Sequence, residues 1–518
     1  MSSATSVDTK NADAICSSQR AHSRSSHSLR WNIFDLIAPP NIPVGTAGET
    51  WVLLDTKKTL LALALTCKSF TEPALDLLWR HLGGLEPLIK NMTLDDWSIF
   101  CKYNYRVRSL LNQCHERYSK DTICSTKNLA CPQSPSLLLP LLPNLTSLTW
   151  DNASDKTFQY VQLFTFGPSK QSIFSSIAKS CPSISDLGFD FGRNRDEYTE
   201  SVGDTSTVLR LWSHLTSVRT GTISEATILH LSKLPSLRVL KFTLPSTSIS
   251  TDAQKLLQRP VFCALQELDV TFNSLVILDA FLEKLAITPK VLSFAITRGV
   301  GSERALPGLI SRLSDVCAHS SLQEVRLSIT GQPAYYNASI EAAAFQPLFA
   351  FRNLRKLDFE PGAFCIVQID DASLLQMAKA WPYLEELCIS KYPSRYQVTP
   401  HAFVVLLRYC PRLRSVTVPI DWSTIDVHTI PPDIPYQGFS QKALSNLFVG
   451  GSRITRPTSI AAFISAVAPN LRSITGTDSS WKTVQNLLET LPMVREQGRR
   501  MMLNEIKRGY YGVDGNVC

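Results

Sequence analysis

The chain has 518 residues, which exceeds one ordinary globular core, so several domains or an elongated array of repeats would fit it. Hydrophobic residues make up 44% of the sequence, which favours a folded protein over a disordered one. The net charge of +8 is small for this length and argues against a nucleic-acid-binding protein.

The 13 cysteines stand singly rather than in C-x-x-C pairs, and the first residues lack an apolar signal region. We therefore expect reduced thiols and a location in the cytoplasm, the nucleus or both. The apolar runs are too short to span a bilayer, so no membrane partner is expected.

The first hundred residues predict a tail followed by a small helical domain. Residues 1–28 are rich in serine and cannot bury much apolar area, so we expect a disordered tail. Residues 29–100 are expected to form an all-α domain whose most regular part, 60–82, predicts two amphipathic helices. Thr71-Glu72-Pro73 predicts the start of the second helix. Residues 101–136 are polar and predict a connector.

Residues 137–476 repeat the phrase L-x-x-L-x-apolar at intervals of about 30 residues, which is typical of a solenoid. Positions one, four and six of each phrase should point into a stacked core, and the rest of each repeat can hold a helix. The fold class is therefore α/β, a leucine-rich-repeat solenoid with parallel strands inside and helices outside. The twelve phrases begin at Leu145, Ile184, Leu215, Leu237, Leu265, Pro289, Leu322, Leu354, Leu384, Leu413, Leu444 and Leu471.

The last segment, residues 477–518, predicts a capping helix and a tail. Residues 481–488 suit a helix that closes the open end of the array. The cluster of Arg495, Arg499 and Arg500 is either a solvated helix face or a contact for an acidic partner.

The polar positions of the strand phrases should line one face of the array. They are mixed in sign, basic near residue 240 and acidic near residues 268 and 385, which favours a protein ligand of mixed charge over a polyanion. Each residue alone also fits ordinary solvated surface. These candidates for substrate binding are Arg238, Lys241, Glu267, Asp269, Glu324, Arg326, Arg355, Lys356, Asp358, Glu385, Glu386 and Arg414.

Two phrases of the helical region resemble a known family. Leu65–Phe70 followed by Glu72–Trp79 resembles the F-box, in the version common in basidiomycete fungi, where C-[RK]-x-F leads into E-P-A-L-D-x-L-W. The repeats resemble those that such proteins carry after the box. The resemblance implies a substrate-recognition subunit of an SCF-type (Skp–cullin–F-box) E3 ubiquitin ligase. Its helices would bind a Skp-family adaptor, and through it a cullin, and its repeats would bind an unknown protein substrate.

Carried over to this sequence, the resemblance implies a set of adaptor contacts. The first helix keeps the leucine and isoleucine of the family's Leu-Pro-x-Glu-Ile opening but lacks its proline and glutamate. The alternative is therefore a leucine-rich-repeat scaffold that binds proteins without ubiquitin-ligase association. The implied adaptor-binding residues are Leu29, Ile33, Leu61, Leu65, Cys67, Phe70 and Trp79.

The sequence offers no pattern for catalysis. It contains no G-x-x-x-x-G-K-[ST], G-x-G-x-x-G, H-E-x-x-H or G-x-S-x-G motif. The cysteines around Cys114-His115 are too irregularly spaced for a zinc finger. We therefore expect a protein that is not an enzyme, with no catalytic residue, cofactor or metal.

Overall fold

The structure is a computed structural model that describes residues 49–82, 94–112, 142–151, 177–190, 202–247, 249–257, 261–283, 285–297, 302–329, 338–362, 365–391, 396–425 and 438–511. The chain divides into two compact units, Met1–Arg195 and Asp196–Cys518, and each is described by itself. The tail expected at 1–28 and the helix expected around Leu29 and Ile33 lie outside the described residues.

The first unit combines helices with the beginning of the sheet. Its strands pair in parallel, β1 with β2, β2 with β3 and β3 with β4. Its described elements are α2 (Glu49–Thr66), α3 (Lys68–Arg80), β1 (His81–Leu82), α5 (Leu94–Tyr103), the 3₁₀ helix η1 (Asn104–Arg106), β2 (Ser109–Asn112), β3 (Ser147–Asp151) and β4 (Asp186–Asp190).

The sheet thus begins before residue 137, which corrects the predicted boundaries. β1 lies in the segment expected to be all-α, and β2 lies in the expected connector. The phrase is degenerate at both strands: Trp79 and Val107 stand where its leading leucine would be, and Gly84 and Asn112 stand at its final apolar position.

The corner between α2 and α3 lies at Cys67, and the prediction of a helix start at Thr71-Glu72-Pro73 was wrong. Cys67 is extended (φ −150°, ψ 129°), and its carbonyl accepts hydrogen bonds from the N–H groups of Phe70 and Thr71. The Thr71 hydroxyl donates to the Ala64 carbonyl of α2 at 2.8 Å. The turn is therefore made four residues earlier than the threonine suggested, and Pro73 lies inside α3.

A small core holds α2 against α3. Leu60 and Ala64, four residues apart on α2, are buried against Ala74 and Leu77 of α3. Leu63, Phe70 and Leu78 pack around these four as partly buried neighbours. The buried stripe of α2 therefore runs through Leu60, and its sequence neighbour Leu61 lies on the outside.

The second unit is a leucine-rich-repeat solenoid. All its ladder pairings with described register are parallel, and each strand predicted from sequence is present, beginning two residues after the first residue of its phrase. The same offset holds for β3 and β4 of the first unit. The strands of the second unit are, in order, β5 (Ser217–Thr222), β6 (Val239–Thr243), β7 (Glu267–Phe272), β8 (Val291–Ile296), β9 (Glu324–Ile329), β11 (Lys356–Glu360), β13 (Glu386–Ile389), β14 (Ser415–Thr417), β15 (Asn446–Gly450) and β16 (Ser473–Gly476).

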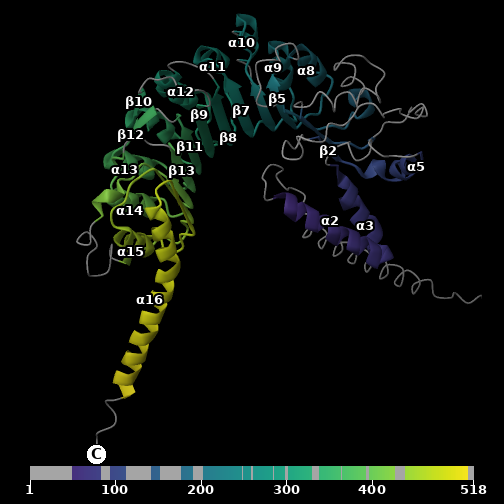
Figure 1. Ribbon diagram of the computed structural model, residues 1–518. Helices are drawn as coiled ribbons and strands as arrows, with labels where there is room; N and C mark the ends of the chain where they lie inside the picture. Colours follow the sequence, from purple (N-terminus) through teal and green to yellow (C-terminus); the bar gives the residue numbers. More distant parts are fainter. Residues whose placement is uncertain are drawn as a thin grey trace, which may run out of the picture. The chain divides into compact units, whose positions relative to one another are not determined.

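The helices of this unit lie on the outer side of the curved sheet, as Figure 1 shows. In the phrase at 237–242, positions one, four and six (Leu237, Leu240 and Phe242) are all buried, as predicted. The helical elements are α8 (Val202–Leu209), α9 (Glu225–Ser232), α10 (Thr251–Leu257), α11 (Leu275–Leu282), α12 (Ser302–Val316), η5 (Ala342–Ala350), α13 (Asp371–Ala380), α14 (Pro400–Tyr409), η6 (Trp422–Thr424) and α15 (Pro457–Val467).

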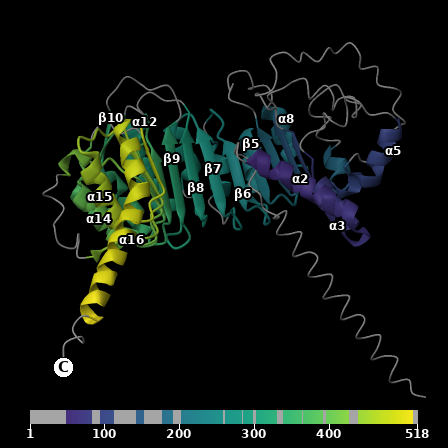
Figure 2. The same cartoon turned by 60° about the horizontal axis from the view of Figure 1, so that its bottom comes forward.

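Two features of the second unit go beyond the predicted pattern. β10 (Ala338–Glu341) and β12 (Cys365–Gln368) form a separate parallel pair. The last helix, α16 (Ser480–Tyr511), is much longer than the predicted 481–488. Its first turns are buried through Trp481 and Val484, and its second half extends beyond the array in both views (Figures 1 and 2).

Candidate functional site

The corner between α2 and α3 exposes apolar side chains. Leu61 is 52% exposed and Leu65 is 79% exposed, and their spacing of four places them on one face of α2. Cys67, at the turn that follows, is also exposed. We call Leu61, Leu65 and Cys67 the corner patch. A partner that covered this face would bury the apolar area of both leucines.

Two other residues of the predicted adaptor set have partners inside the first unit. Phe70 packs against the core of the helical pair. The Trp79 ring stacks on Tyr103 with centroids 5.4 Å apart and lies 6.3 Å from the Phe100 ring of α5. Of the seven residues, Leu61 and Leu65 share one exposed face of α2, and Cys67 is exposed at the turn that follows. Phe70 and Trp79 pack inside the first unit. Leu29 and Ile33 lie outside the described residues.

A buried arginine that sequence reasoning missed lies beside the same helix. The Arg106 side chain is 4% exposed and forms ion pairs with Glu72 and Asp76 of α3. Burial opposes the charged form, but the hydrogen bond with Glu72 and the charge of Asp76 prevail and raise the pKa of Arg106. The available signal was the spacing of Glu72 and Asp76, which puts two carboxylates on one helix face.

The charged candidates of the array lie in rows across the inner face, as predicted. Register places Lys241, Asp269, Arg326 and Asp358 in one row that crosses β6 to β11, with Ser293 of β8 between Asp269 and Arg326. The row beside it contains Glu267, Glu324, Lys356 and Glu386. Arg238, Arg355, Glu385 and Arg414 each immediately precede a strand.

Most of these charges are neutralised by one another. Lys241 Nζ lies 3.1 Å from Asp269 Oδ2, and Arg326 Nη2 lies 2.7 Å from Glu324 Oε2. Arg355 pairs with Glu385, and Lys356 pairs with Glu386. Among the described residues, the candidates without an ion-pair partner are Arg238, Glu267, Asp358 and Arg414. A ligand on this face therefore meets dipolar pairs more than free charges.

A cluster on β11 and β13 contains inner-face residues that the phrase analysis left out. Ligand atoms of Asp358, Glu360 and Cys388 lie within 4.8 Å of one another. The Lys391 ammonium lies 2.8 Å from Glu360 Oε1, so the cluster already holds a cation of the protein itself. Burial, with the charges of Glu360 and Asp358, raises the pKa of the Cys388 thiol, which remains a hydrogen-bond donor to Glu360. We assign no metal to this cluster.

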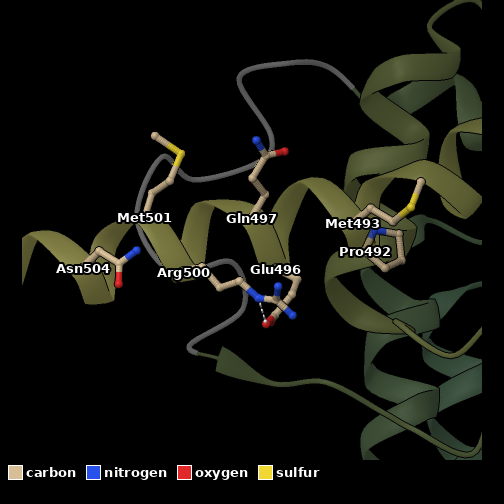
Figure 3. Close-up of a pocket in the computed structure, with 7 residues that line it drawn as sticks. All are labelled: Pro492, Met493, Glu496, Gln497, Arg500, Met501 and Asn504. Atoms are coloured by element: carbon tan, nitrogen blue, oxygen red, sulfur yellow. Dashed lines mark hydrogen bonds and ion pairs between the residues drawn. The ribbon is translucent and has the colours of Figure 1, made fainter.

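The basic cluster of α16 is also largely paired. Arg499 and Arg500 both contact Glu496, and their hydrogen bonds lower the pKa of its carboxyl to about 2. Arg495 donates to the Ser465 carbonyl of α15. A hollow of about 500 Å³ lies beside this helix. Every described residue that lines it belongs to α16, as the side chains in Figure 3 show. One helix face encloses no ligand site.

No helix in the described part of the chain has both the length and the apolarity needed to cross a membrane. No family model matches the sequence, and no curated protein matches it.

Solved structures give distant likenesses. Rad7, in its complex with Elc1 from yeast, is 15% identical with a TM-score of 0.33, covering 62% of this chain and 88% of its own. The internalin InlF of Listeria monocytogenes is 12% identical with a TM-score of 0.29, covering 65% and 82%. Mouse RP105, in its complex with MD-1, is 10% identical with a TM-score of 0.27, covering 74% and 70%. At these values the likenesses carry no argument about function, and the fold assignment depends on the strands and repeats above.

Proposed function

We propose that the protein is the substrate-recognition subunit of an SCF-type E3 ubiquitin ligase, in which α2 and α3 are the F-box that binds a Skp-family adaptor. The exposed corner patch carries this proposal. Leu61 and Leu65 remain open to solvent while Leu60 and Ala64 complete the core of the helical pair. Burying a leucine side chain contributes about 1.5–3 kcal/mol, so covering both would supply a large share of the affinity for a partner.

In this proposal the array binds the protein substrate through its inner face, and the adaptor connects the protein to a cullin. The protein itself is not an enzyme, because its effect is to raise the concentration of substrate near the enzyme that transfers ubiquitin. Such a role fits a cytoplasmic or nuclear protein with reduced thiols.

Capture of a purified Skp-family adaptor by the full-length protein tests the proposal. We expect Leu61→Asp with Leu65→Asp to weaken capture at least about 100-fold, since two charges would enter an apolar contact. The matched control is Ile99→Asp on α5, because Ile99 is 50% exposed and lies outside the corner patch. Failure of the wild-type protein to capture the adaptor, or equal capture by the double variant, would contradict the F-box assignment.

The second candidate function is a leucine-rich-repeat scaffold that binds proteins without a cullin. The inward positions of Phe70 and Trp79 favour it, because they leave a smaller exposed contact than the resemblance implied. Affinity purification distinguishes the two functions: a scaffold would retain protein partners through the array with neither adaptor nor cullin present.

A further inference from the structure

We infer that the Glu72–Trp79 segment of α3 is a joint that fixes the helical pair to the first strands of the repeat sheet, with Arg106 as its positioning residue. The geometry stands independently of the proposed function. The joint would also fix the orientation of the corner patch relative to the first strands. That consequence matters only if the corner patch binds the adaptor, so it rests on the proposed function.

The residues of the joint lie on one face of α3. Glu72, Asp76 and Trp79 are spaced by four and three residues, so their side chains project from the same side of the helix. The residues buried against α2, Ala74 and Leu77, belong to another face. The segment that resembles the family motif therefore has two structural roles. One face closes the helical pair, and the other contacts the elements that lead into β2.

Arg106 contacts both carboxylates of this face at once. Its Nη2 group pairs with Glu72, and its Nη1 group pairs with Asp76 and donates to the Glu72 carbonyl at 3.2 Å. The rings of Tyr103 and Tyr105 lie 5.8 and 5.1 Å from the guanidinium carbon, within the range of cation–π contacts. A planar guanidinium with several donors suits this arrangement, and a lysine would reproduce only part of it.

The backbone around Arg106 connects α3 to the sheet. The Arg108 N–H donates to the Arg80 carbonyl at the end of α3 at 3.0 Å. The Arg108 carbonyl accepts hydrogen bonds from Thr146 and Ser147, where β3 begins. β2 itself pairs with β1, which directly follows α3. The side-chain contacts of Arg106 therefore add a second attachment, at the middle of α3, to the attachment at its end. A helix attached only at its end can rotate about that point, whereas a second attachment at its middle prevents this rotation.

Hydrogen exchange of the full-length protein tests the joint. We expect Arg106→Gln to raise exchange across residues 68–80 about tenfold, since a buried ion pair loses one partner while the carboxylates stay hydrated. Arg108→Gln is the matched control, because Arg108 is exposed and two residues away. Arg106→Lys should restore part of the protection. Exchange in the second unit and capture of the Skp-family adaptor should not change, because Arg106 pairs with Glu72 and Asp76 of α3, whereas the leucines of the corner patch belong to α2.

Equal exchange of residues 68–80 in Arg106→Gln and wild type would overturn the inference. So would faster exchange in every element of both units, because that would indicate general destabilisation. If Arg106→Gln does not fold, Glu72→Gln with Asp76→Asn removes the same contacts through side chains that are 71% and 43% exposed. A wild-type protein that fails to capture the adaptor would refute the proposed function, and the exchange result would still decide the joint.

Discussion

The corner patch and the inner face of the array are opposite kinds of surface. The corner patch presents apolar side chains, with Leu65 79% exposed. The inner face presents charged side chains that are already paired between neighbouring strands, such as Lys356 with Glu386. On the first surface, a partner gains by burying Leu61 and Leu65, whose apolar side chains form no ion pair or hydrogen bond that it must replace. On the second, a partner must replace or desolvate existing ion pairs, and the net gain is small unless the fit is close.

The corner patch is therefore suited to affinity, and the inner face is suited to selectivity. Apolar burial is non-directional and suits a partner that is bound constantly, whereas a surface of fixed dipoles rejects ligands whose charges do not match. The predictions below test each side of the comparison.

Replacing Leu60 should have the largest effect on stability. Leu60 is 2% exposed and Leu61 is 52% exposed, although they are neighbours on α2. We expect Leu60→Ala to cost about 2–5 kcal/mol in the local stability of the helical pair. Leu61→Ala should stay within about 0.5 kcal/mol and weaken adaptor capture instead. Hydrogen exchange of α2 measures both, and similar losses for the two variants would remove the distinction between core and corner patch.

The rate of thiol alkylation should show whether the adaptor covers Cys67 of the corner patch. Cys67, Cys101 and Cys263 are exposed, while burial raises the pKa of Cys317 and of Cys410 to about 12. With iodoacetamide at pH 8, we expect Cys67, Cys101 and Cys263 to react first among the cysteines that the structure describes. Saturating adaptor should slow Cys67 about tenfold or more, as expected for a site covered by a partner, and leave Cys263 unchanged. Unchanged reactivity of Cys67 in the bound complex would exclude it from the contact.

Reversing charges on β13 should have a smaller effect on stability and a clear effect on partners. Glu385→Lys with Glu386→Lys removes the pairs with Arg355 and Lys356 and sets like charges side by side. We expect a loss of about 1–2 kcal/mol in thermal or urea unfolding, since each pair is partly exposed.

The charge-swapped control adds Arg355→Glu and Lys356→Glu to this double variant. It should regain stability through the restored pairs without regaining the wild-type set of co-purifying proteins. An unchanged set of partners in the double variant would count against the inner face as the binding surface.

A small pH effect should be confined to the first unit. Partial desolvation, with Arg80 and Lys57 nearby, lowers the pKa of His81 at the end of α3. A lowered pKa means that the unfolded state takes up the proton first, so stability is complete above about pH 6.5 and is lost as the pH falls through the folded-state pKa. We expect the melting temperature of this unit to fall by about 2 °C or less from pH 7.5 to 5.5. His81→Asn should abolish that shift.

The array could be predicted from sequence because the same short phrase marks the strand of each repeat. L-x-x-L-x-apolar places three buried residues on one strand, and the strands began at the same offset throughout the phrases. β1 and β2 were not predicted because both the leading leucine and the final apolar residue of the phrase are replaced there, by Trp79 and Gly84 at β1 and by Val107 and Asn112 at β2. The corner at Cys67 was not predicted because Thr71 resembles a helix N-cap in the sequence. In the structure, the Thr71 hydroxyl instead donates to the Ala64 carbonyl across the corner.

The site was less predictable because its contacts join distant positions. Arg106 lies 34 residues from Glu72, and nothing in the local pattern links them. The family motif indicated that Trp79 was important without showing which neighbour it faces, and Tyr103 supplied the answer. The pairing of Lys356 with Glu386 depends on register between strands, which the repeat period alone leaves open.

Two tryptophans where α16 packs on the solenoid provide an intrinsic spectroscopic probe of that contact. The ring centroids of Trp422 and Trp481 lie 5.6 Å apart, with an angle of 80° between the ring planes. The indole N–H of Trp481 donates to the Ser452 carbonyl at 2.9 Å. Near-ultraviolet circular dichroism and fluorescence respond to such a pair, so undocking of α16 would be visible without any attached dye. Trp79, stacked on Tyr103 in the other unit, would report on the helical pair, and single Trp→Phe replacements would assign each signal to its own end of the chain.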